Sequence, residues 1–182
     1  MFDPSWSLRP EALELVKSLV AEGRHRVVEC GSGLSTVTIA RSLRALAKGH
    51  VHALEHDPHW SATTREALEH EDVTEFATVV DAPLVDGWYD PAALDRLPER
   101  GIDLLVVDGP PAGEPEIERS RYPALPALAD RLAPEAAVLL DDADRPGERW
   151  TLERWRSEFE IEPLPAPPGT ALALYIPRRV RG

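Results

Sequence analysis

Short apolar runs recur along the chain, and most of them end in an acidic residue. The five clearest cover residues 27–30, 51–55, 76–82, 102–108 and 136–142, and two further candidates lie at 159–164 and 170–176. Runs of this length, rich in Val, Leu and Ile, are typical of strands that are buried on both faces of a sheet. The pattern therefore predicts a sheet of seven strands.

Between these runs, apolar residues three or four positions apart predict helices. One begins at Pro10, one follows a glycine turn at 31–33, one begins at Asp57 and its proline, and the last covers 145–159. The segment 116–132 also has helical character, but two internal prolines predict that it is kinked or divided. Alternating strands and helices predict a doubly wound, Rossmann-like α/β sheet with helices on both faces.

The composition is consistent with a single domain over residues 1–182, since a chain of this length supports one sizeable core. The formal net charge of −12 argues against a nucleic-acid partner, because phosphate binding needs a basic surface. Cys30 is the only cysteine, so no intramolecular disulfide forms. No apolar run approaches the ~20 residues of a membrane helix, and no signal segment opens the chain, so we expect a cytoplasmic protein without a membrane partner.

The first strand leads into a turn that carries chemistry, Glu29-Cys30-Gly31-Ser32-Gly33-Leu34-Ser35-Thr36. In an open α/β sheet such a turn lies where ligands bind, and the following helix offers free N–H groups to an anion. A dinucleotide site would place a third glycine at Thr36, and the Glu29 carboxylate would repel a pyrophosphate. The same carboxylate suits the cationic part of S-adenosylmethionine. A turn that only links strand to helix is the structural alternative.

Carboxylates end the other strands as well. Glu55 follows Gly33 by 55 − 33 = 22 positions, near the ~20-residue spacing of an acid that holds ribose hydroxyls. Asp81 ends the third strand, Asp108 the fourth, and the pair Asp141-Asp142 the fifth. Core packing does not require acids at every strand end, so this regularity indicates a ligand site.

With these residues in this order, the chain resembles the class I S-adenosylmethionine-dependent methyltransferases. The resemblance implies strand order 3-2-1-4-5-7-6 with strand 7 antiparallel. It also implies a cofactor site formed by Glu29, Gly31, Ser32, Gly33, Ser35, Glu55, His56, Asp81, Ala82 and Asp108. The chain departs from the family at Ser35, where many members have a third glycine.

For the chemistry, Asp108 is the best candidate to orient or deprotonate the acceptor, and Asp142 is a second catalytic candidate. A cation-dependent branch of the family places acids after strands four and five, so Asp108, Asp141 and Asp142 are candidate ligands for a divalent cation. That branch also carries a lysine after the strand-four acid, where this chain has Gly109 and two prolines. Helix capping, or pairing with Arg145, is the alternative role of these acids.

The acceptor is expected to be a small molecule, methylated on O or N, because the chain has no appended substrate domain. Trp88 and Tyr89 are candidates for an apolar wall of its pocket. Arg119, Arg121 and Tyr122 either bind an anionic group of the acceptor or form a solvated helix face. A second subunit of a homodimer could also complete the pocket. Two other functions stay open, an NAD-type oxidoreductase and a non-catalytic binding protein with this fold.

Overall fold

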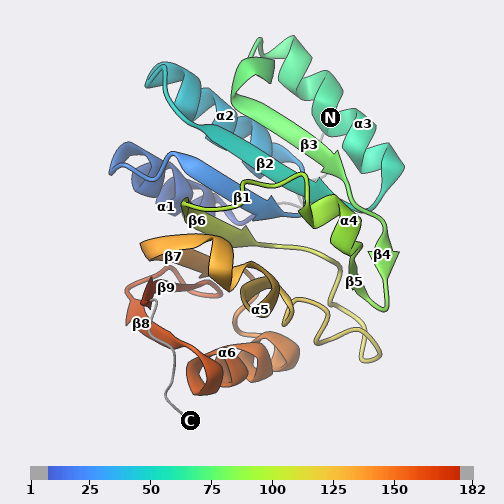
Figure 1. The fold of residues 1–182 in the computed structure, drawn as a ribbon, viewed down its shortest axis with the longest axis vertical. Helices are drawn as coiled ribbons and strands as arrows, with labels where there is room; N and C mark the ends of the chain where they lie inside the picture. Colours follow the sequence, from blue (N-terminus) through green and yellow to red (C-terminus); the bar gives the residue numbers. More distant parts are fainter. Residues whose placement is uncertain (1–7, 177–182) are drawn as a thin grey trace.

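The computed structural model describes residues 8–176 and contains one seven-stranded sheet (Figure 1). Its strands, in chain order, are β1 (Arg26–Cys30), β2 (His50–Glu55), β3 (Ala77–Asp81), β6 (Ile102–Val107), β7 (Leu132–Leu140), β8 (Glu160–Leu164) and β9 (Ala171–Ile176). The order across the sheet is β3-β2-β1-β6-β7-β9-β8. All pairs are parallel except those of β9, which is antiparallel to β7 and β8. The predicted strand order is confirmed, with strand 7 antiparallel.

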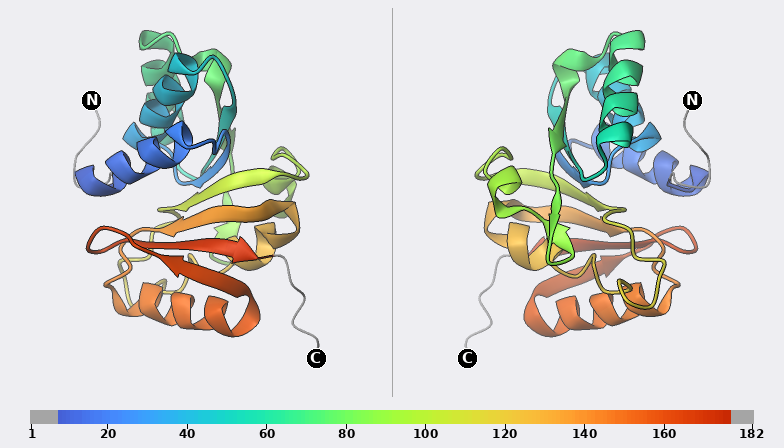
Figure 2. Two further views of the ribbon diagram at one scale, coloured as in Figure 1. Left: turned by 90° about the vertical axis from the view of Figure 1, so that its left-hand side faces the viewer. Right: turned by 90° about the vertical axis from the view of Figure 1, so that its right-hand side faces the viewer.

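Helices cover both faces of this sheet (Figure 2). The first group is α1 (Pro10–Ala21), α2 (Leu34–Ala45) and α3 (Pro58–His70), and the second is α4 (Pro91–Leu94), α5 (Ala124–Leu128) and α6 (Pro146–Glu158). Each group packs on its own hydrophobic cluster. Successive residues of a strand alternate between the clusters: Val27 contacts the α1–α3 side, whereas Val28 contacts the α4–α6 side.

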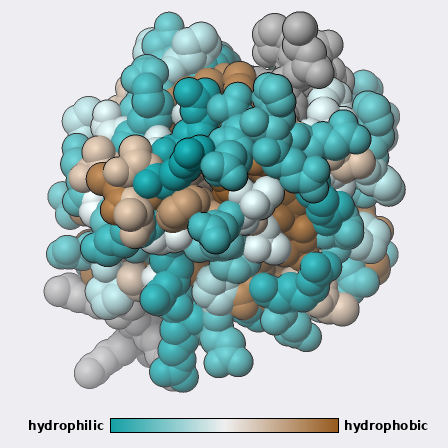
Figure 3. All heavy atoms as spheres, turned by 90° about the horizontal axis from the view of Figure 1, so that it is seen from above, coloured by the Kyte–Doolittle hydropathy of each residue, from teal (hydrophilic) through white to brown (hydrophobic). Residues whose placement is uncertain are grey.

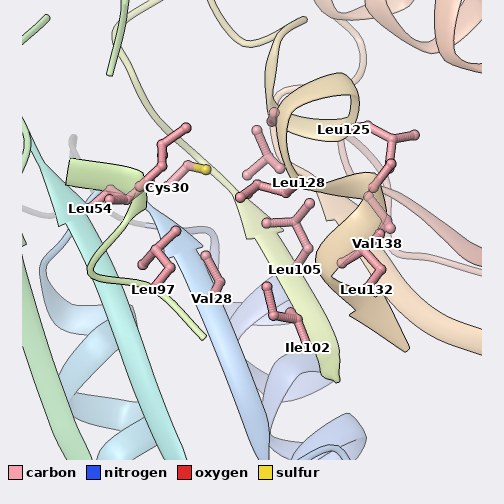
Figure 4. Close-up of a cluster of buried hydrophobic side chains, with 14 of the residues drawn as sticks. Val28, Cys30, Leu54, Leu97, Ile102, Leu105, Leu125, Leu128, Leu132 and Val138 are labelled. Carbon is pink, nitrogen blue, oxygen red and sulfur yellow. The ribbon is translucent and has the colours of Figure 1, made fainter. Parts of the chain in front are cut away.

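Figure 4 shows the second cluster, in which side chains from β1 and β6 converge on those of α5. Leu105, Leu125 and Leu128 are fully buried there. Burial on both faces explains why most residues of these strands are apolar. The acids Glu29 and Glu55 lie at or next to the carboxyl ends of their strands, where a ligand can reach them.

The segment 116–132 differs from the prediction. Only 124–131 is helical, as α5 followed by the single 3-10 turn η3 (Ala129–Arg131), while 114–123 consists of turns and bends. The helix begins just after Pro123, and Pro126 lies in its first turn, where a missing N–H breaks no intrahelical hydrogen bond. The irregular 109–123 segment is free to fold over the strand ends as a loop, and it forms one side of the site described below.

Between β3 and β6 the chain forms a short hairpin, β4 (Leu84–Val85) with β5 (Trp88–Tyr89). Another single 3-10 turn, η2 (Thr74–Phe76), precedes β3. The surface is largely hydrophilic on the face drawn in Figure 3, consistent with the high content of charged residues. Within 8–176, none of the helices combines the length and the apolar character that crossing a membrane requires.

Candidate functional site

A cavity of about 770 Å³ lies at the carboxyl ends of the parallel strands. The arrowheads of β1, β2, β3 and β6 point to the same side of the molecule (Figure 1). Backbone hydrogen bonds extend the sheet one residue beyond the strands: the Asp108 N–H donates to the Cys30 carbonyl over 3.1 Å, and the Asp141 N–H donates to the Val107 carbonyl over 3.0 Å. This register brings acids that are far apart in the sequence to one edge of the sheet, at the point where strand order reverses.

Most of the residues predicted from the sequence line this cavity. They are Glu29, Gly31, Ser32, Gly33, Ser35, Glu55, His56, Asp108, Asp141 and Asp142. Two strand-end residues, Asp81 and Ala82, do not line it. The Asp81 side chain is largely exposed and accepts hydrogen bonds from Ser61 and Arg65 of α3, with 2.9 Å from the Arg65 guanidinium. Ala82 is fully buried. The ion pair with Arg65 directs the Asp81 carboxylate along α3, away from the cavity.

Two turns from non-adjacent stretches of sequence meet at the floor of the site. Gly31, in the turn after β1, has φ +96°, a left-handed backbone conformation that glycine adopts without strain. A Cβ on Gly109, in the turn after β6, would lie 2.6 Å from the Tyr89 hydroxyl and 2.9 Å from the Gly31 nitrogen. Glycine at position 109 is therefore required by the close approach of the two turns.

Replacing Gly109 with alanine is expected to lower the melting temperature by about 3–10 °C, since overpacking at such contacts typically costs about 1–3 kcal/mol. Gly113 provides the matched control: it also lines the cavity, but a Cβ there would meet nothing within 4 Å. Differential scanning calorimetry of both variants measures the difference. Equal melting temperatures for Gly109→Ala and Gly113→Ala would show that the two turns can move apart to accommodate a Cβ at position 109 without loss of stability.

Glu29 lies at the bottom of the cavity and is 1% exposed. One carboxylate oxygen, Oε2, accepts a hydrogen bond of 2.5 Å from the Thr36 hydroxyl, which in turn accepts one of 3.1 Å from the Gly33 N–H. The other oxygen, Oε1, has no hydrogen-bond partner of normal geometry among the described residues, although the Ser35 hydroxyl lies near the carboxylate. Burial raises the pKa of Glu29 to about 7, an effect that the hydroxyls of Ser35 and Thr36 only partly offset. A buried, unpartnered carboxylate oxygen of this kind is a binding site for a donor, and a cationic donor suits it best.

Glu55 ends β2 and closes the other side of the glycine turn. Its carboxylate accepts hydrogen bonds from the Ser32 N–H (3.0 Å), the Ser32 hydroxyl (2.9 Å) and the Asp57 N–H (2.9 Å). His56 Nδ1 lies 3.1 Å from the same carboxylate. Burial alone would raise the pKa of Glu55, but the hydrogen bonds from His56, Asp57 and Ser32 outweigh it and lower the pKa. Glu55 is therefore a fixed anion at the cavity wall.

On the opposite wall, Asp108, Asp141 and Asp142 place carboxylate oxygens within 4.8 Å of one another. We call these three residues the carboxylate cluster. Burial raises the pKa of Asp108 well above its usual range; the Arg121 charge opposes this shift, and the neighbouring acids add to it. Burial likewise raises the pKa of Asp141, whose carboxylate accepts a hydrogen bond of 3.4 Å from the Thr170 hydroxyl. A carboxyl with a raised pKa accepts protons more readily, which suits a general base.

Arg121 lies against the carboxylate cluster. Its side chain is 6% exposed, and its guanidinium is 3.4 Å from Asp108 and 3.2 Å from Asp142. Two further guanidinium groups pair with Asp142 at the rim, that of Arg145 at 2.8 Å and that of Arg9 at 3.6 Å. The sequence left two roles open for Arg121, a contact to an anionic group of the acceptor or a place on a solvated helix face. The second is wrong, because the Arg121 side chain is buried. Basic and acidic side chains alternate along this wall.

The neighbours of Arg121 do not share its position. The Arg119 guanidinium stacks over the Trp150 ring at 4.5 Å, and the Tyr122 hydroxyl donates to Glu158 over 2.7 Å. Neither lines the cavity. Of the two residues predicted as a pocket wall, Tyr89 lines the cavity and Trp88 does not. Sequence reasoning did not identify Arg9 and Trp60 as lining residues. The position of Trp60 could have been inferred from the sequence, because it lies in the first turn of the helix that Asp57 caps, directly after β2.

Comparison with known proteins gives the following. A family model described as a methyltransferase domain matches residues 28–143. An O-methyltransferase from Bacillus cereus, in complex with S-adenosylhomocysteine, superposes with a TM-score of 0.71 at 17% identity, over 94% of this chain and 84% of that one. The O-methyltransferase TomG from Streptomyces achromogenes, in complex with S-adenosylmethionine, gives 0.65 at 18%, over 95% and 83%. A methyltransferase from Geobacter sulfurreducens gives 0.66 at 18%, over 94% and 81%. No match was found among the curated proteins.

The structural neighbours share the fold, and the family model covers well over half of the chain, including the glycine turn and the carboxylate cluster. The resemblance inferred from the strand-end acids is thereby confirmed. The chain belongs to the methyltransferase-domain family, within the class I S-adenosylmethionine-dependent methyltransferases.

Proposed function

We propose that the cavity binds S-adenosylmethionine and that the enzyme methylates an oxygen atom of a small-molecule acceptor. The observation that carries the proposal is the buried Glu29 oxygen without a partner, directly beside the glycine turn. S-adenosylmethionine has a cationic ammonium and sulfonium next to a carboxylate. We assign the cationic part to Glu29 and the carboxylate to the backbone N–H groups in the first turn of α2.

The remaining cofactor contacts follow from the same wall. We assign the ribose to Glu55, whose carboxylate is held in place by the turn, and assign further cofactor contacts to Gly31, Ser32, Gly33, Ser35, His56 and Asp108. Asp81 and Ala82 are left out of this set, because they lie outside the cavity. A pyrophosphate-containing dinucleotide is disfavoured, since Glu29 and Glu55 would both repel it.

S-adenosylmethionine supplies the methyl group as an electrophile. Asp108 then has the task of orienting the acceptor and taking its proton. Arg121 favours an oxygen nucleophile over an amine, because a guanidinium donates to oxygen lone pairs and repels a protonated amine. The O-methyltransferase activity named for several structural neighbours supports the same choice. The cavity volume of about 770 Å³ is suited to small molecules.

Thermal-shift measurements with S-adenosylmethionine, S-adenosylhomocysteine and NAD test the cofactor. The first two are expected to stabilise the protein by about 2.7 kcal/mol at a concentration 100 times their dissociation constant, while NAD leaves it unchanged. Stabilisation by NAD alone would overturn the assignment. A panel of matched hydroxyl and amino compounds, with a labelled methyl donor, then distinguishes oxygen from nitrogen acceptors. The homodimer and the cytoplasmic location remain predictions. Light scattering, which gives the molar mass in solution, tests the homodimer.

A further inference from the structure

The carboxylate cluster resembles a cation site in its composition. Asp108, Asp141 and Asp142 each offer an oxygen, and these oxygens lie within 4.8 Å of one another. Hard cations such as Mg²⁺ and Ca²⁺ are bound by such groups of oxygen ligands. Acidic groups gather without a metal in many proteins, so the cluster alone does not establish a site. The decisive observation is what already lies against it.

Arg121 supplies a positive charge to this cluster. Its Nη2 is 3.4 Å from Asp108 Oδ1, its Nη1 is 3.2 Å from Asp142 Oδ2, and the same Nη1 is 3.5 Å from Glu148 Oε1. The side chain is 6% exposed, and Glu148 is 1% exposed. An arginine stays charged throughout the physiological pH range. The carboxylates therefore have a permanent cation within the fold.

The position of the guanidinium is fixed by the backbone. Its Nε donates to the Pro110 carbonyl over 3.2 Å, and its Nη1 donates to the Asp141 carbonyl over 3.4 Å. These bonds connect the loop after β6 with the end of β7, which are the two segments that carry the cluster. A divalent cation between Asp108 and Asp142 would lie next to this fixed charge, and the repulsion is strong in a buried site.

We propose that Arg121 takes the place of a divalent cation, so that the carboxylate cluster binds no metal and the guanidinium positions Asp108 instead. Arg121 is a positioning residue in this scheme. Its Nη2 carries two N–H groups and makes one contact among the described residues, to Asp108. The second N–H is available to an oxygen of the acceptor, because Arg121 lines the cavity. This inference goes beyond the proposed function, since it concerns the protein without cofactor or acceptor.

Titration of the metal-free protein with Mn²⁺, followed by electron paramagnetic resonance, tests the proposal. The wild-type protein is expected to leave Mn²⁺ free at 1:1 concentrations, roughly in the 0.1–1 mM range where weak protein sites fill. Removing the charge with Arg121→Ala is expected to create a cation site, with at least about tenfold tighter Mn²⁺ binding. Arg121→Lys retains the charge and is expected to behave as the wild type. Arg119→Ala, two residues away and outside the cavity, is the matched control and is expected to bind no Mn²⁺.

The wild-type titration decides the proposal even where Arg121→Ala does not fold. One Mn²⁺ bound per wild-type chain, lost in Asp108→Asn, would overturn it. A folded Arg121→Ala that binds Mn²⁺ no better than the wild type would also overturn it. Because these titrations contain no S-adenosylmethionine, their failure is distinct from a failure of the proposed function, which the cofactor thermal shifts report.

Discussion

Replacing Glu29 with glutamine is expected to stabilise the unliganded protein at pH 8 and to weaken S-adenosylmethionine binding at the same pH. The wild-type protein holds a buried carboxylate whose pKa is raised from 4.5 to about 7 by desolvation. At pH 8 the group is charged in the folded state, at a cost of about 3 kcal/mol from a shift of this size. Glutamine keeps the shape and removes the charge.

The pH dependence follows from the direction of this shift. Since the folded pKa lies above the unfolded value, the contribution of Glu29 to stability is fully present below pH 4.5 and is lost as the pH rises through about 7. The stability advantage of Glu29→Gln should therefore be small at pH 5 and reach its full size by pH 8. Chemical denaturation of both proteins at several pH values measures it. A constant difference between pH 5 and pH 8 would contradict the burial of a charge at this position.

Whereas Glu29→Gln should make the unliganded protein more stable, it should make S-adenosylmethionine binding weaker. Loss of a charge-assisted hydrogen bond typically costs about 1.5–3 kcal/mol, which is roughly 10- to 100-fold in affinity. Isothermal titration calorimetry with S-adenosylmethionine at pH 8 measures this loss. Glu69→Gln, an exposed glutamate on α3 and outside the cavity, is the matched control and should change neither property. A Glu29→Gln variant that binds as tightly as the wild type would remove the cationic contact from the proposed site.

Asp108→Asn is expected to reduce methyl transfer by about 100- to 10,000-fold, the range typical of a lost general base. The asparagine still reaches Arg121 and the acceptor, but it takes no proton. Because burial raises the pKa of Asp108, wild-type turnover should increase as the pH rises and the carboxyl loses its proton. The variant should lack this increase. Labelled methyl transfer to the acceptor found in the panel, measured from pH 6 to pH 9, gives both results.

The matched control is a residue of β6, the strand that Asp108 directly follows. Asp103, near the start of β6, accepts a hydrogen bond of 2.8 Å from the Arg26 N–H and does not line the cavity. Asp103→Asn retains an acceptor oxygen there and should leave turnover unchanged. Asparagine keeps a polar side chain at the proposed cofactor contact of Asp108, so affinity for S-adenosylhomocysteine should fall far less than turnover in Asp108→Asn and should be unchanged in Asp103→Asn. If Asp108→Asn instead lost cofactor affinity while its turnover at saturating cofactor stayed normal, Asp108 would contact the cofactor only and would not act on the acceptor.

The sheet and one wall of the site could be predicted from the sequence because their signals are local. A strand buried on both faces is mostly apolar, so the acids Glu29, Glu55 and Asp108 mark the region where a strand ends and a ligand can reach it. Parallel pairing then brings these ends together whatever their separation in the chain. The glycine turn is equally local, since the conformation of Gly31 depends on its immediate neighbours and on the turn after β6.

The other wall was less predictable for a physical reason. Arg121 belongs to a segment without regular structure, and its position depends on contacts with Pro110, Asp142 and Glu148 that no short pattern contains. The sequence predicts a helix that includes Arg121, because the helical spacing of apolar residues in α5 extends back into this segment. For Asp81 the position at the end of β3 was predicted correctly, but its place in the cofactor site was not. The carboxylate pairs with Arg65 on α3, a contact that the strand pattern does not contain.

The order of the segments around the cavity has an evolutionary consequence. The part assigned to the cofactor comes mainly from residues 29–56, whereas the part that faces the acceptor comes mainly from 108–121 and 141–145. The two parts meet where the turn after β1 approaches the turn after β6, at Gly31 and Gly109. Related chains can therefore diverge in the loop after β6, and exchange one methyl acceptor for another, while the part assigned to the cofactor keeps its ligand. Grafting that loop between relatives is a direct way to redirect such an enzyme.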